Sequence, residues 1–111
     1  MEITRREIRY YRKVNGAIPY WIWFSSLHDE KVKNMIRTRL DRGLIGNFGD
    51  HRWVGQGIFE LRFDFGPGYR VYFGVDGKKL VILLCAGDKG SQARDIEMAH
   101  EFWIDYRRRS Q

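Results

Sequence analysis

The sequence predicts an α+β fold, in which a mostly antiparallel sheet is preceded by two helices and followed by one. Two segments carry this prediction: in residues 57–63 and 69–73, apolar residues alternate with charged or polar ones. A β-strand sends successive side chains to opposite faces, so each segment predicts a strand with one apolar side. The intervening Gly66-Pro67-Gly68 turn can fold the two strands into a hairpin. Residues 80–85 are apolar throughout, which is typical of a central strand buried on both faces.

Length and composition predict a single folded domain that spans residues 1–111. The chain is 43% hydrophobic and 15% aromatic, which is enough to bury a core and excludes a disordered protein. Its single cysteine, Cys85, cannot form an intramolecular disulfide, and no Cys/His cluster has the spacing of zinc ligands. We therefore expect neither a metal nor a disulfide to hold the fold together.

The charge and the hydropathy of the chain point to its partners and location. A formal net charge of +6 favours polyanionic partners, nucleic acid first. The charged opening residues do not resemble a signal peptide. The longest apolar run is far shorter than the ~20 residues that span a bilayer. A cytoplasmic protein without a membrane partner is the simplest expectation.

A strand, a turn and a first helix are expected before the sheet. Residues 3–14 mix arginines with apolar and aromatic residues and predict a strand, and Asn15-Gly16 is a turn signal. Pro19 suits the first turn of a helix. Residues 20–24 would continue it as a short and very aromatic helix.

A second helix is predicted between Asp29, a reasonable N-cap, and Gly43, which can close it as a C-terminal glycine. Apolar residues at helical spacing predict its buried side: Val32, Met35, Ile36 and Leu40. The other side carries Lys33 and Arg37 among further basic residues. Such a side is usually a solvated surface, and the second interpretation is that Lys33 and Arg37 flank an RNA groove.

Four strands and a final helix complete the prediction. The strands are expected at residues 52–56, 58–64, 69–75 and 79–86, with a hairpin turn at Asp76-Gly77 before the last. Ser91 is expected to cap the final helix. The apolar stripe of this helix would be Ile96, Ala99, Trp103 and Tyr106, with Phe102 alongside. Cys85 would then be a small buried hydrophobic residue without a catalytic role.

The same alternation gathers polar groups on one face of the predicted hairpin, namely Glu60 and Arg62 from one strand and Arg70 and Tyr72 from the other. This set suits metal-free cleavage of RNA, which needs a base, an acid and fixed positive charge on the phosphorane. Glu60 could be the base, and the two arginines could hold the phosphate. Lys89, after the buried strand, could be a further cation or the acid. Alternatively, the charged groups form ordinary cross-strand ion pairs on a water-facing sheet.

Over roughly residues 10–103 the sequence resembles a known family. Three blocks carry the resemblance: Phe59-Glu60-Leu61-Arg62, then Gly66-Pro67-Gly68-Tyr69-Arg70-Val71-Tyr72, then Gly87-Asp88-Lys89. The segments Gly46-Asn47-Phe48-Gly49-Asp50 and Pro19-Tyr20-Trp21 also fit. Together they resemble the addiction-module killer proteins, a branch of the RelE/ParE toxin superfamily that is related to the RelE and HigB toxins.

The resemblance implies a small RelE-like toxin of a type II toxin-antitoxin module. Such toxins cut messenger RNA in the ribosome without a metal or other cofactor. A cognate antitoxin wraps the toxin, and the pair binds operator DNA through the antitoxin complex. By position, the resemblance implies that Arg70 binds phosphate and that Arg62 and Lys89 match other basic site residues. Glu60 departs from RelE, which has a basic residue at this position. Tyr72 projects to the same face of the sheet as these residues.

Two other functions remain open from the sequence. A ParE-type toxin shares the fold but poisons DNA gyrase and cuts no RNA, and the joint presence of the four charged residues above favours the nuclease. A phage-derived module that is no longer toxic would persist as an antitoxin-binding co-repressor. In both toxin interpretations we expect the antitoxin to cover part of an aromatic surface formed by Tyr20, Trp21 and Trp23. The alternative is that these residues belong to the core, which we expect for at least one of the tryptophans.

Overall fold

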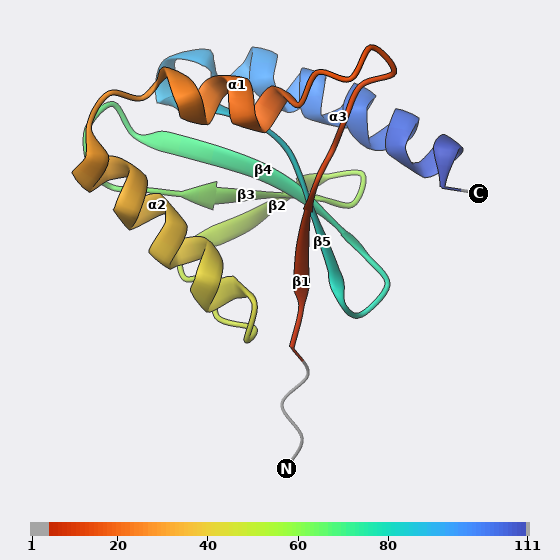
Figure 1. The fold of residues 1–111 in the computed structure, drawn as a ribbon, viewed down its shortest axis with the longest axis horizontal. Coiled ribbons are helices and arrows are strands. Elements are labelled where there is room, and N and C mark those ends of the chain that lie inside the picture. The colour runs from red at the N-terminus through yellow and green to blue at the C-terminus, as the bar shows by residue number, and fades with distance from the viewer. Residues whose placement is uncertain (1–4, 111) are drawn as a thin grey trace.

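The computed structural model describes residues 5–110 as a five-stranded sheet with helices packed on both faces (Figure 1). In chain order the elements are β1 (Glu7–Tyr10), α1 (Pro19–Ser26), α2 (Glu30–Gly43), β2 (His51–Gly55), β3 (Ile58–Arg62), β4 (Tyr69–Asp76), β5 (Leu80–Asp88), a 3₁₀ turn (Lys89–Ser91) and α3 (Gln92–Arg109). The strand order is β1-β5-β4-β3-β2, with β1 parallel to β5 and the other neighbours antiparallel. The predicted α+β architecture is confirmed.

One face of the sheet packs against α1 and α2 through apolar side chains alone. Alternate residues of the central strands meet the two helices in this core: Leu61, Phe63, Val71, Phe73, Val81 and Leu83 from the strand side, with Tyr20, Phe24, Ile36 and Leu40 from the helices. Phe73 stacks between Phe48 and Phe59, with ring centroids 4.7 and 5.5 Å away. The alternation in the sequence therefore predicted the buried side of β3 and β4 correctly.

The opposite face packs against α3. Its apolar part consists of Ile58, Tyr72, Ile82 and Leu84 from the sheet and Ala99, Phe102 and Trp103 from the helix, with Ile96 and Tyr106 half-buried beside them. Trp103 lies so close to β4 that a Cβ at Gly74 would come 2.5 Å from its ring. Tyr106 donates a hydrogen bond to Asp76 at 2.7 Å. The predicted stripe of the last helix is thus its docking side.

β5, like β3 and β4, contributes side chains to both cores. Its residues 81–85 are all buried, as the uninterrupted apolar run predicted. Burial raises the pKa of the Cys85 thiol to about 12. The thiol therefore stays protonated at neutral pH, in agreement with a packing role.

The predicted turns and strand limits agree closely with the structure. Gly16 and Gly77 adopt φ angles of +91° and +68° in the two expected turns. β5 continues two residues beyond its predicted end, through Gly87 to Asp88. The predicted first strand is shorter than expected, because β1 covers only Glu7–Tyr10. Ile3 and Thr4, at the start of that prediction, lie outside the described residues.

The second helix begins as predicted, and three of its four predicted core residues face the core. Asp29 caps it, since its Oδ1 accepts hydrogen bonds from the amides of Lys31 (2.9 Å) and Val32 (3.4 Å). Met35, predicted to be buried, is 45% exposed. The buried positions follow the four-residue spacing from Val32 through Ile36 to Leu40. Met35 precedes Ile36 by one residue, so its side chain points away from this line and is partly exposed.

Two predicted helix-end roles are wrong. Gly43 ends α2, but the next residue, Leu44, is still helical (φ −62°, ψ −26°), so Gly43 does not reverse the chain. It is a glycine because the ring of Phe48 occupies the space of a Cβ. Ser91 makes no cap for α3; its hydroxyl instead donates to the Asp95 carboxylate at 2.5 Å.

Candidate functional site

Five of the seven site residues proposed from the sequence come together at one end of the sheet, beside the start of α3. The β3–β4 register places Glu60 opposite Tyr72 and Arg62 opposite Arg70. The β4–β5 register ends with Tyr69 opposite Asp88, which brings the next residue, Lys89, to the same end. We call Glu60, Arg62, Arg70, Tyr72 and Lys89, with Gln92 of α3, the polar cluster.

The Glu60 carboxylate is the centre of the polar cluster, and its side chain is fully enclosed (0% exposed). Its Oε2 accepts hydrogen bonds from Gln92 Nε2 at 2.7 Å and from the Tyr72 hydroxyl at 3.1 Å. Its Oε1 has no hydrogen bond and faces Arg62 Nε at 3.6 Å and Arg70 Nε at 3.9 Å. Two guanidinium groups therefore share one buried carboxylate.

Arg70 is nearly buried, at 6% exposure. Its Nη1 donates to the backbone carbonyl groups of Gly68 (2.9 Å) and Tyr69 (3.0 Å), with a longer contact to Phe63 (3.4 Å). Gly68, at φ +76°, lets this loop approach: a Cβ there would lie 3.3 Å from both Arg70 Nη1 and Lys89 Cβ. Arg70 is consequently held in one orientation by the main chain and by Glu60.

Three cations at this end of the sheet face the solvent. The Arg62 side chain is 34% exposed, and Lys89 is exposed in the turn before α3. Arg52, on the edge strand β2, is paired with Glu60 in the β2–β3 register and is exposed. Directly opposed residues of antiparallel strands project to the same face. Arg52 therefore extends the positive charge of Arg62 along the polar side of the sheet.

The polar side of the hairpin is more enclosed than the sequence suggested. The sequence left two interpretations of Glu60: a base that contacts the substrate, or a member of surface ion pairs. Both assumed that its carboxylate faces water. The structure instead encloses Glu60 beside α3, with Gln92 in direct contact. A general base has to come within hydrogen-bond reach of the proton that it removes. In this conformation the carboxylate is placed to orient the arginines.

Tyr72 is likewise fully buried, so its ring offers no surface on which a base could stack. Burial, and then the neighbouring Glu60 carboxylate, raise the pKa of the Tyr72 hydroxyl far above its ordinary value. The hydroxyl remains a hydrogen-bond donor to Glu60 at any physiological pH. Its contribution to the cluster is to hold the carboxylate.

Lys33 and Arg37 do not join the polar cluster. Both belong to α2, on the other face of the sheet, and their charged groups lie 5.5 and 5.0 Å from the ring centre of Phe24. Each is also 3.9 Å from the carboxylate of Glu30. Of the two interpretations left open by the sequence, this geometry is that of a solvated, ion-paired helix surface.

The sequence analysis gave no role to Gln92, a member of the polar cluster, or to Arg52 beside it. Arg52 could have been placed only from the pairing of β2 with β3, which sets it opposite Glu60. A bulge beside Gly55 shifts that pairing by one residue. The signal for Gln92 was its place in the stripe, because residues 92, 96, 99 and 103 follow helical spacing on the side that docks onto the sheet. Both assignments need the packing of elements distant in sequence.

Residues 5–110 contain neither a metal-binding cluster nor a membrane-spanning helix. No group of three or more His, Cys, Asp or Glu side chains in this range is arranged to hold a metal ion. No helix in the same range is both long enough and apolar enough to cross a bilayer.

Comparison with known proteins places the chain in a family. A protein of Haemophilus influenzae, itself described as "Uncharacterized protein", is 51% identical over 87 residues, which cover 78% of this chain and 88% of that protein. The profile of the family described as "Phage derived protein Gp49-like (DUF891)" matches residues 23–101. That match includes most of both cores and the whole polar cluster. The chain belongs to this phage-derived, Gp49-like family.

Proposed function

We propose that this protein is the toxin of a type II toxin-antitoxin module and a RelE/HigB-like endoribonuclease that cleaves messenger RNA on the ribosome without a metal ion. The observation that carries the proposal is the buried Glu60 carboxylate, 3.6 and 3.9 Å from the Nε atoms of Arg62 and Arg70. Burying charged groups opposes folding unless they are well paired, so such clusters often serve function. Membership of the Gp49-like family supports the toxin class.

The proposed chemistry is attack of the 2′-hydroxyl on the adjacent phosphorus, which releases the 5′-oxygen of the next nucleotide. The hydroxyl loses its proton to solvent water, and the leaving oxygen takes a proton from Lys89 or from water. Negative charge builds up on the phosphorane, and guanidinium groups stabilise it best when they are already oriented. Arg62 and Lys89 face solvent and would contact this phosphate, while Arg70 adds fixed charge from behind. Removing one such donor typically lowers the rate by ~10²–10³.

Glu60 acts in this proposal as the anchor of the arginines. Its hydrogen bonds from Gln92 and Tyr72 keep the carboxylate fixed, and the carboxylate keeps the two guanidinium groups from turning away. A preorganised site of this kind reorganises little during the reaction. Glu60→Gln should therefore lower cleavage even though the residue does not touch RNA.

The proposed partner is a cognate antitoxin in the cytoplasm, and operator DNA would be bound through their complex. Trp21 and Ile22 of α1 are 41% and 64% exposed and offer an apolar surface for it. Tyr20, expected with them, is instead buried in the core, and Trp23 is half-buried. An acidic antitoxin segment laid over Arg62 and Lys89 would block the site by charge complementarity.

The test is primer extension on a message in a cell-free translation reaction, with and without ribosomes. We expect new cleavage sites only on translated message, and at least ~10²-fold slower cleavage with Arg62→Ala. Arg62 suits this test better than Arg70, because its partly exposed side chain makes no backbone hydrogen bonds in the described chain. Arg9→Ala, a change in an exposed arginine on β1, is the matched control and should cut like the parent.

Each other outcome points to a different function. Cleavage of naked RNA would keep the nuclease and remove the ribosome from its mechanism. Intact message from folded protein, together with DNA-damage signalling in cells, would favour the ParE-type poisoning of DNA gyrase. Intact message with no growth defect would favour a non-toxic co-repressor.

A further inference from the structure

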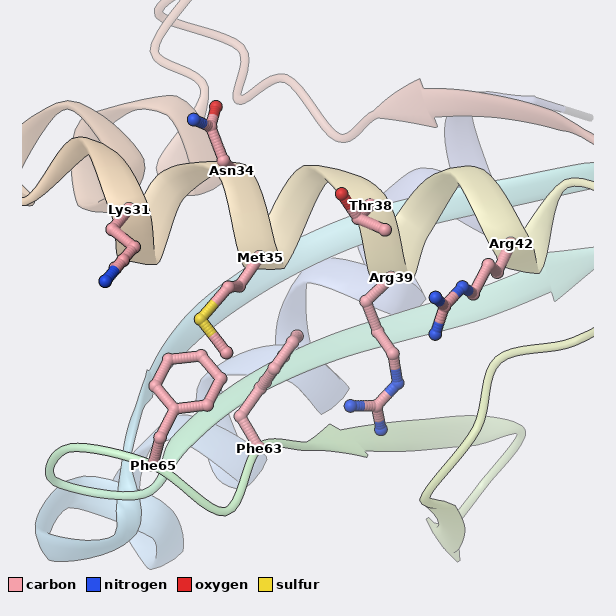
Figure 2. A pocket seen from close by; sticks show the side chains of 8 residues that line it. All are labelled: Lys31, Asn34, Met35, Thr38, Arg39, Arg42, Phe63 and Phe65. Atoms are coloured by element: carbon pink, nitrogen blue, oxygen red, sulfur yellow. The ribbon is translucent and has the colours of Figure 1, made fainter.

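A groove of about 390 Å³ lies between α2 and the loop that joins β3 to β4, on the sheet face opposite the polar cluster (Figure 2). The residues that line it include Lys31, Met35, Arg39 and Arg42 from α2 and Phe63 and Phe65 from the loop side. No residue of the polar cluster lines it.

The floor of the groove is apolar and partly open. Met35, which the helical pattern predicted to be buried, is 45% exposed here. Figure 2 shows its side chain reaching from the helix toward the ring of Phe65. Phe63 and Phe65 meet edge to face, with ring centroids 5.7 Å apart. An exposed thioether beside aromatic rings is a surface that adapts to apolar partners.

Positive charge stands at both ends of this floor. Figure 2 places Lys31 at one end and Arg39 and Arg42 at the other. Arg39 is fixed by hydrogen bonds to the carbonyl groups of Phe48 (2.6 Å), Asp50 (2.8 Å) and Arg62 (2.7 Å). Lys31 and Arg42 are exposed and have no ion-pair partner within residues 5–110. No acidic residue lines the groove.

The spacing of the charges defines the occupant. Lys31 and Arg42 are eleven residues apart on α2, which corresponds to ~16 Å along a helix. We propose that the groove binds a segment of a partner protein that carries a large apolar side chain at its centre and acidic residues toward both ends. A nucleic acid fits less well, since it carries a charge on every nucleotide and would leave phosphates over the uncharged stretch around Met35.

The inference does not depend on the proposed nuclease activity. The groove and the polar cluster lie on opposite faces of the sheet, so peptide binding and RNA cleavage are measured separately. Loss of one leaves the other to be judged on its own result.

The experiment is selection of a phage-displayed random-peptide library on the immobilised protein. We expect enriched peptides to combine aromatic or long aliphatic residues with flanking Asp or Glu. Synthetic copies should bind roughly tenfold or more weakly to the charge-reversed variant Lys31→Glu/Arg42→Glu, because two attractions become repulsions. The matched control is Lys78→Glu/Lys79→Glu, which makes the same change in net charge in the exposed β4–β5 turn and should bind like the parent.

A second variant tests the floor. Met35→Ser removes exposed apolar surface without touching the buried core and should also weaken binding several-fold. Circular dichroism and thermal melting of every variant establish that it is folded. Should Lys31→Glu/Arg42→Glu fail to fold, Lys31→Gln/Arg42→Gln replaces it, with a smaller expected loss.

Three results would overturn the proposal. The first is an absence of enriched peptides, or enrichment of peptides without acidic residues. The second is equal weakening by both double variants, which would indicate attraction to overall charge. The third is a single-stranded RNA oligonucleotide that binds the parent and loses affinity with Lys31→Glu/Arg42→Glu, since this would assign the groove to nucleic acid.

Discussion

On the face toward α1 and α2, the inward side chains of β3 and β4 are all apolar or aromatic, and they form one continuous core. On the face toward α3, the same two strands have apolar packing near one end of the pair, at Ile58 and Gly74, and buried charge toward the other, at Glu60 and Arg70. Both faces are built from the same strands in the same register. They differ in which alternate residues they present and in the helices that cover them.

The difference teaches where this molecule gives up stability. An apolar face gains free energy from every buried side chain. A buried carboxylate with one oxygen lacking a hydrogen bond opposes folding, and apolar residues of similar volume are often at least as stabilising. We infer that the polar cluster is retained for its chemistry. The substitutions below test this contrast in order of decreasing expected effect.

Phe73→Ala should give the largest loss of stability. Phe73 is buried between two stacked rings on the apolar face, and its removal leaves a cavity. We expect about 3–5 kcal/mol less free energy of unfolding, measured by urea denaturation. A loss below about 1 kcal/mol would mean that this face is not the main stabilising core.

Glu60→Gln should be nearly as severe, about 3 kcal/mol, because it leaves two guanidinium groups without their carboxylate. Glu7→Gln is the matched control: Glu7 is an exposed acid in a surface ion pair and should contribute little. The contrast between the faces would fail if Glu60→Gln were more stable than the parent and equally active.

Tyr72→Phe should cost about 1.5–3 kcal/mol, since it removes one hydrogen bond to a buried carboxylate that Gln92 still holds. Combination with Gln92→Leu in a double-mutant cycle measures whether the two donors act together on Glu60. Strictly additive losses would show that Tyr72 and Gln92 act independently.

The smallest expected effect is the change in stability between pH 9 and pH 10. Burial raises the Cys85 pKa from 9.0 to about 12, so above pH 9 the unfolded state loses a proton that the folded state keeps. Stability should be fully present below pH 9 and should fall toward pH 12, by at most about 1.4 kcal/mol per pH unit from this group. Cys85→Ala should flatten the slope between pH 9 and 10, before tyrosines in the unfolded chain ionise. An unchanged slope would mean that other groups govern the alkaline loss.

Most of the fold could be predicted from local patterns. Period-two alternation around Leu61 and Val71 predicted the apolar face, and the Asp29 cap and the apolar run of β5 marked two further elements. Met35 escaped the prediction because helical spacing gives the direction of a side chain and says nothing about how far the neighbouring core extends.

The sequence predicted which strand residues form the candidate site, but it did not predict that Glu60 is buried. Strand alternation brought Glu60, Arg62, Arg70 and Tyr72 to one face, as found. The burial of Glu60 depends on Gln92, thirty-two residues away, and on how α3 docks against the sheet. A docking angle follows from many simultaneous side-chain contacts, and no single segment of sequence contains it.

The parallel pairing of β1 with β5 has a consequence for biosynthesis. β1 is made first, yet its partner is completed only at Asp88, and Gln92 follows shortly after. A growing chain therefore cannot close its sheet, or enclose Glu60, until most of its residues have left the ribosome. A fragment that stops before Gln92 would lack the assembled cluster, so a prematurely terminated product should not carry the activity proposed for the full chain.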